Sequence, residues 1–183
     1  DLLITVPLVK ASQNRLINEI DLFVDDNFKA KFILNIEKSY KNAPYYADVI
    51  SLIRAVINAD ISNIGEYAAN SVRRVSNYLG LNTRFYFSSI LSPESRGIDK
   101  ADRLIHICKK LGGINYVNAI GGRELYSKEY FKNNEVDIFF LQTLGSEYGQ
   151  FSSSFVPNLS IIDVLMFNDV SEIRKMLENH VLI

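Results

Sequence analysis

The residues best suited to ligand chemistry lie in two loops, each of which follows a predicted strand. The first loop, residues 88–97, is rich in hydroxyl groups, and the second begins with a pair of glycines whose backbone N–H groups a ligand can approach. Ligands of open α/β sheets bind beyond the carboxyl ends of the strands. If strands 83–87 and 114–120 are neighbours, both loops line one crevice; alternatively, the glycines only make a tight turn. The candidate binding residues in or beside these loops are Ser89, Arg103, Gly121, Gly122, Arg123 and Tyr126.

Two cations stand in the first turn of a predicted helix over residues 99–111. Lys100 and Arg103 oppose the positive end of the helix dipole there, which costs a few tenths of a kcal/mol or more. One explanation is neutralisation by the neighbouring Asp99 and Asp102. The other is an anionic ligand, such as a carboxylate or the phosphate of a nucleotide-sugar, held by the helix terminus and the cations together.

Asp163 is the candidate catalytic carboxylate. It stands three residues after Ser160, in a pattern typical of a helix capping box, so a helix-capping role is the first expectation. Capping and catalysis can coexist at this position. The other usual catalytic side chains have structural explanations: Cys108 lies on an apolar helix stripe with Leu104, Ile107 and Leu111, His106 lies off that stripe, and His180 stands at the end of the chain.

Composition excludes several classes of protein. With 20 Lys and Arg against 21 Asp and Glu, the net charge of −1 argues against electrostatically driven nucleic-acid binding. Two His and one Cys cannot form a structural zinc site without carboxylates, and no phosphate-loop fingerprint is present, so we expect neither a metal nor a cofactor. A single cysteine fits a reducing compartment, and no apolar run approaches the ~18 residues of a membrane span. We expect a cytoplasmic globular protein, with oligomerisation left open.

The elements predict an α/β fold with an open, mainly parallel sheet, βαβ units, flanking helices and a helical insertion in the first half. Strand–helix–strand spacing in the second half indicates parallel strands. No linker or repeat divides the chain, so residues 1–183 are expected to form a single domain. The expected strands are 2–8, 17–24, 83–87, 114–120 and 136–141, and the expected helices are 28–40, 44–57, 63–79, 99–111, 128–132, 160–167 and 170–178.

Several stretches spread over nearly the whole chain carry a family resemblance. The most specific are the strand–Gly-Gly–x-Glu-Leu-Tyr unit within residues 102–131 and the run FVPNLSIIDVLMFND at 155–169. Further segments are TVPL, KASQNRLINEI, YKNAPYY, YLGLNTRF, SSIL and EYGQ. In these segments the chain resembles the WbqC-like protein family. Family members usually carry a further strand, a Gln-Pro turn and a Gly-Tyr helix before the T-V-P strand. We expect that segment to be missing from this single WbqC-like α/β domain, which leaves an active site incomplete.

The resemblance implies a role in the biosynthesis of O-antigen or another bacterial surface polysaccharide, with glycine or another acyl group transferred to an activated sugar. In that hypothesis Asp163 serves as base, and the backbone N–H groups of Gly121 and Gly122 donate to the carbonyl oxyanion. Arg103 and Arg123 hold phosphate or carboxylate. The alternative is a non-catalytic protein that binds a nucleotide-sugar or a partner enzyme. A third hypothesis is a scaffold that docks through helices 27–79, which would need an exposed apolar patch there.

Overall fold

The computed structural model describes residues 3–183, which fall into two compact units. The first unit comprises residues up to Thr83 together with Glu147–Arg174, and the second comprises Arg84–Ser146 with Lys175–Ile183. Each unit has its own hydrophobic core, and each is described separately below.

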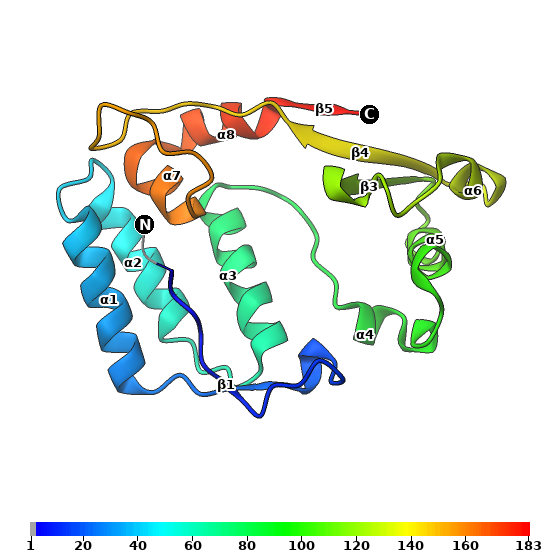
Figure 1. Ribbon diagram of the computed structural model, residues 1–183, viewed down its shortest axis with the longest axis horizontal. Helices are drawn as coiled ribbons and strands as arrows, with labels where there is room; N and C mark the ends of the chain where they lie inside the picture. The colour runs from blue at the N-terminus through cyan, green and yellow to red at the C-terminus, as the bar shows by residue number, and fades with distance from the viewer. Residues whose placement is uncertain (1–2) are drawn as a thin grey trace. The chain divides into compact units, whose positions relative to one another are not determined.

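Three helices dominate the first unit: α1 (Asp26–Tyr40), α2 (Tyr46–Ile57) and α3 (Ile64–Tyr78) (Figure 1). Local sequence sets their ends. The carboxylate of Asp25 accepts a hydrogen bond from the Phe28 N–H and begins α1, and the Asn63 side chain accepts from two backbone N–H groups at the start of α3. All three predicted helices in this part of the chain are therefore confirmed.

The core of the first unit lies between these helices and α7 (Ile161–Phe167), with α8 (Val170–Glu178) following. α1 and α7 each contact α2. Val49, Met166 and Leu165 are essentially inaccessible to solvent. A short antiparallel pair, β1 (Leu8–Val9) and β2 (Asp21–Leu22), with a 3₁₀ turn at Ile17–Glu19, completes the unit.

The second unit is built on a three-stranded sheet of order β3-β4-β5. β3 (Asn115–Ala119) and β4 (Asp137–Thr143) are parallel and joined through α6 (Lys128–Asn133), which is the predicted βαβ unit. β5 (His180–Leu182) pairs antiparallel with β4. Ile138 and Phe140 point from β4 into a core shared with α5 (Lys100–Lys110) and α6. The α/β class with flanking helices is thus confirmed, although the sheet is small.

One strand prediction was wrong and two were wrong in part. Residues 83–87 form no strand: this segment, rich in residues that favour strands, is extended and leads directly into α4 (Ser88–Leu91). Strand propensity is realised only where a neighbouring strand takes up the backbone hydrogen bonds. The predicted strand 2–8 reduces to Leu8–Val9 within the described residues, with Leu2 outside them, and 17–24 reduces to Asp21–Leu22.

Candidate functional site

A buried carboxylate organises the most polar part of the first unit. Asp163 is 4% exposed, and its two oxygens accept three hydrogen bonds. The Tyr40 hydroxyl donates to Oδ2 at 2.9 Å, while the Tyr148 hydroxyl and the Gln150 amide donate to Oδ1 at 2.7 and 2.9 Å. All three partners are hydrogen-bond donors, which matches an ionised carboxylate because its oxygens can only accept.

Three separate segments supply this cluster. Tyr40 ends α1, Asp163 lies in the first turn of α7, and Tyr148 and Gln150 come from the loop between β4 and α7. Gln150 also fixes that loop: its amide oxygen accepts from the Val156 N–H and its amide nitrogen donates to the Val156 carbonyl oxygen. The carboxylate therefore ties a helix end and a loop to α7.

The hydrogen-bonding role of Asp163 differs from the predicted capping box. Ser160 does cap α7, because its hydroxyl oxygen accepts from the Ile162 N–H. The Asp163 carboxylate turns inward to the tyrosines and Gln150 instead of reaching back to the helix start. The helix-cap expectation was correct for Ser160 and wrong for Asp163.

Both tyrosines hold their protons tightly. Burial, and then the hydrogen bond to Asp163, raise the pKa of Tyr148 to about 12. The same causes in the same order raise the pKa of Tyr40 far above its usual range. Each hydroxyl is a committed donor to the carboxylate, so the lone pairs of the phenol oxygen remain available as acceptors.

A pocket of about 710 Å³ lies beside Tyr40. Its volume falls within the ~300–1,000 Å³ of small-molecule sites. One wall is a single face of α1, where side chains three and four residues apart stand one above another. The described residues that line it are Leu3, Ile4, Phe32, Asn35, Ile36, Ser39, Tyr40, Leu159, Ser160 and Ile162.

The sequence did not indicate Tyr40, Tyr148 and Gln150 as partners of Asp163. They lie 123, 15 and 13 residues away from it along the chain. Their spacing therefore carries no local periodicity. The one available signal was that Tyr40, Tyr148, Gln150 and Asp163 all fall inside stretches that carry the family resemblance.

In the second unit, Arg103 is held by hydroxyl groups. Its Nε donates to the Ser95 Oγ at 3.3 Å and its Nη2 donates to the Ser88 Oγ at 3.1 Å. Of the two explanations offered for Arg103, the ion pair with the first-turn carboxylates does not form: Asp99 caps the Lys100 N–H, and Asp102 accepts from the Tyr130 hydroxyl. The guanidinium, which is partly buried, is therefore bound only to neutral groups within the described residues.

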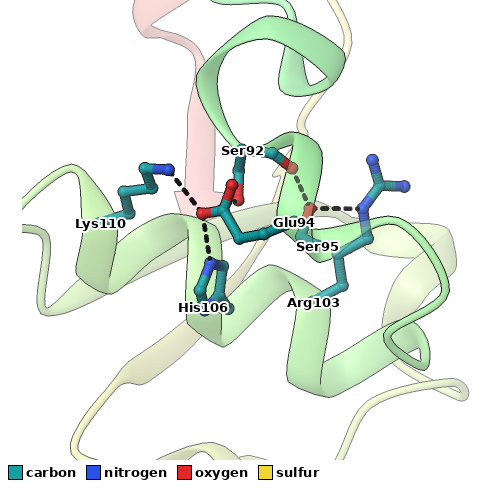
Figure 2. Close-up of polar contacts among 6 residues, drawn as sticks. All are labelled: Ser92, Glu94, Ser95, Arg103, His106 and Lys110. Carbon is teal, nitrogen blue, oxygen red and sulfur yellow. Dashed lines mark hydrogen bonds and ion pairs between the residues drawn. The ribbon is translucent and has the colours of Figure 1, made fainter.

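Glu94, which precedes Ser95 in the chain, binds residues other than Arg103. Glu94 accepts from Lys110 at 2.5 Å and from Ser92 at 3.0 Å, and its Oε1 lies 3.1 Å from the His106 Nε2. Figure 2 shows this carboxylate and the guanidinium on opposite sides of Ser95. The hydrogen bond from Lys110, followed by backbone and His106 contacts, lowers the pKa of Glu94 to about 2.

The remaining predicted binding residues are not joined to Arg103. Gly121 and Gly122 lie in the 3₁₀ turn Ile120–Gly122 directly after β3. Ser89 and Arg123 are exposed, and Tyr126 packs edge-on against the buried Phe131. Within the described chain, no hydrogen bond or ion pair connects Arg103 with the glycine pair or Arg123. Because 83–87 is not a strand, the predicted crevice between two neighbouring strands is not formed as expected.

Two helix predictions in this unit can also be checked. Cys108 is buried, as expected, and burial raises the pKa of its thiol. The core-facing side of α5 is carried by Ile105 and Cys108, whereas Leu111, which was assigned to the apolar stripe, is 48% exposed. His180, near the end of the chain, lies in β5, and its Nδ1 is 2.8 Å from the Leu177 carbonyl oxygen.

No helix among residues 3–183 is both long and apolar enough to cross a membrane. The same residues contain no cluster of three or more His, Cys, Asp or Glu side chains that could hold a metal ion.

Comparison with known proteins identifies the family of the chain. No match was found among curated proteins or among solved structures. A model of the WbqC-like protein family matches residues 1–175, which include Asp163, its three hydrogen-bond donors and the pocket beside them. The chain therefore belongs to the WbqC-like protein family.

Proposed function

We propose that this protein is a transferase that places an acyl or aminoacyl group on a hydroxyl or amine of an activated sugar during the biosynthesis of a bacterial surface polysaccharide. Membership in the WbqC-like family supports the class of pathway. The observation that supports the chemistry is the hydrogen bond between Tyr40 and the buried Asp163 at the wall of a pocket large enough for a small molecule.

In this proposal Tyr40 is the catalytic residue and Asp163 acts through it. Asp163 is 4% exposed, whereas Tyr40 lines the pocket, so the hydroxyl or amine of the acceptor sugar meets the phenol oxygen rather than the carboxylate. The acceptor O–H or N–H donates to the Tyr40 oxygen, whose own proton is already directed at Asp163 Oδ2. The raised pKa of Tyr40 favours a resting phenol over a phenolate.

The proposed transfer needs no reactant besides the acyl donor and the acceptor sugar. As the acceptor oxygen or nitrogen forms a bond to the carbonyl carbon of the acyl donor, its proton moves to Tyr40 and the Tyr40 proton moves to Asp163. The bond from the carbonyl carbon to the leaving group breaks, and the leaving group departs with the electron pair. General acid–base help of this kind contributes typically about 10²–10⁴ in rate.

The second unit carries a separate proposed anion-binding set. Among the described residues Arg103 has only neutral hydroxyl partners, which leaves its positive charge available to a phosphate or carboxylate. Ser89, Gly121, Gly122, Arg123 and Tyr126 remain the proposed binding residues that accompany it. A ligand with anionic character, such as a nucleotide-sugar, fits this set.

The transferase proposal is tested with purified protein, a panel of nucleotide-linked amino sugars as acceptors, and acyl and aminoacyl thioesters as donors. Mass spectrometry should detect the acylated sugar, and Tyr40→Phe should lower turnover by at least about 100-fold. Tyr86→Phe, which removes the hydroxyl of an exposed tyrosine, is the matched control. Full turnover by Tyr40→Phe would place the chemistry elsewhere.

The same experiment separates the alternative function. Saturable binding of a nucleotide-sugar with no product from any donor would favour a non-catalytic binding protein. A ligand at 100 times its dissociation constant adds about 2.7 kcal/mol of stability, so a thermal-shift screen detects such binding without assuming turnover.

A further inference from the structure

We infer that the pocket beside Tyr40 takes the uncharged part of the substrate, a hexose ring with hydroxyl or acetamido groups, and excludes phosphate. The inference rests on the proposed function only in taking a sugar as the ligand. It is argued from the charge, the free hydrogen-bonding groups and the aromatic wall of the pocket.

The described residues that line the pocket supply no positive charge. None of the described residues that line it is ionisable except the Tyr40 phenol, which stays neutral because its pKa is raised. Asp163 lies directly behind Tyr40, 2.9 Å from its hydroxyl. A phosphate placed here would give up its hydration without a cation and would approach a carboxylate, and both effects are unfavourable.

The polar groups of the pocket instead suit neutral donors and acceptors. The side chains of Asn35 and Ser39 have no hydrogen-bond partner among the described residues, so both are free to bind a ligand. Tyr40 presents acceptor lone pairs, because its proton is committed to Asp163. An amide, a hydroxyl and a phenol oxygen together match a ligand whose own groups both donate and accept, as sugar hydroxyls do.

The arrangement of these groups favours a ring. Phe32, Asn35 and Ser39 stand on one face of α1 together with Tyr40, at spacings of three and four residues. This places an aromatic side chain, which can cover the apolar face of a sugar, in line with three polar groups that can meet its hydroxyls. Ser160 adds a further hydroxyl from the start of α7 on the other side of the pocket.

Binding is measured by calorimetry on the full chain with two probes: the methyl glycoside of N-acetylglucosamine and the same glycoside carrying a 6-phosphate. The neutral glycoside should bind saturably and at least about 10-fold more tightly than the phosphate. Tyr40→Phe should weaken the neutral glycoside by about 5-fold, the equivalent of one hydrogen bond, and Tyr86→Phe should leave it unchanged.

Each contrary outcome overturns the inference. If the neutral glycoside does not bind, or if the 6-phosphate binds as tightly, the pocket does not select an uncharged sugar. If Tyr40→Phe leaves the affinity of the neutral glycoside unchanged while the protein stays folded by circular dichroism, the ligand binds elsewhere. Tyr40-dependent binding of the neutral glycoside in a protein with no transfer activity would support this inference and remove the transferase proposal.

Discussion

At the scale of single residues, the buried carboxylate of Asp163 joins a helix end and a loop to α7. It accepts from Tyr40 at the end of α1 and from Tyr148 and Gln150 in the loop that precedes α7. Removing one donor leaves the carboxylate with two others, whereas removing the carboxylate leaves three donors without their acceptor. The asymmetry makes Asp163 the residue least tolerant of substitution in the cluster.

The raised pKa of Tyr148 predicts a specific dependence of stability on pH. Its pKa is about 12 in the folded protein against about 10 for a free tyrosine, so the folded state binds the phenol proton more tightly. The stability from this difference is present below about pH 10 and is lost as the pH rises through about 12. Urea unfolding should therefore show a gap between wild type and Tyr148→Phe that is constant below about pH 10 and shrinks above it. A gap that stays constant up to about pH 12 would contradict this account.

Arg103→Ala should separate a ligand-binding role from a structural one. The substitution removes two hydrogen bonds to Ser95 and Ser88, which should lower the free energy of unfolding by about 1 kcal/mol. It should weaken the affinity for inorganic pyrophosphate, measured by calorimetry, by at least about 10-fold. Arg84→Ala, at an exposed position of the same unit, is the control for both measurements. Loss of stability with unchanged pyrophosphate affinity would make Arg103 a purely structural tether.

At the scale of elements, the end of α3 is fixed by a glycine and an arginine together. Gly80 has a φ of 65°, and Arg174 donates from Nε to the Leu79 carbonyl oxygen at 2.6 Å and from Nη2 to the Gly80 carbonyl oxygen at 3.1 Å. These bonds satisfy carbonyl groups that a helix end leaves open. Gly80 and Arg174, which comes from α8, therefore end α3 together.

Gly80→Ala should lower the free energy of unfolding by more than the strain that a side chain adds at a positive φ. The strain of the left-handed conformation is about 1–2 kcal/mol, and an added Cβ would clash with Arg174 Nη2, so the arginine must move. Gly112→Ala is the matched control, with a similar φ of 71° and no atom within 4 Å of its Cβ. Denaturant midpoints should show a larger loss for Gly80→Ala; equal losses would mean that the Arg174 contacts contribute nothing.

Helices and strands differed in how well the sequence predicted them. α1 and α3 carry their caps and apolar periodicity within a few residues, so their existence follows from local sequence. Strand formation depends on a partner, and residues 83–87 have the composition of a strand without one. The reverse holds for β5, which was not predicted from the sequence and which forms where β4 offers an open edge.

At the scale of the whole molecule, the chain has two cores. One gathers the helices of the first unit, and the other gathers α5, α6 and β4 of the second. Phe131 is fully buried in the second core, where it stacks on Tyr116 and meets Tyr126 edge-on. The single-domain organisation expected from the absence of a linker stays a prediction.

Phe131→Ala tests whether the two cores unfold independently. Loss of a fully buried phenylalanine should cost about 3–5 kcal/mol. If the second core is an independent unit, hydrogen exchange followed by mass spectrometry should show lost protection concentrated in residues 84–146. Leu125→Ala, at an exposed position, should have little effect. Equal loss of protection in both units would instead support one cooperative domain.

The sequence by itself determined every α-helix except α4, the βαβ unit, the burial of Cys108 and membership in the family. These features follow from periodicity, caps and motifs that are contiguous along the chain. Only the tertiary structure decided which side chains meet Asp163 and that Arg103 binds serine hydroxyls rather than carboxylates. A hydrogen bond between residues 123 positions apart depends on how α1 and α7 pack, and no local pattern records that packing.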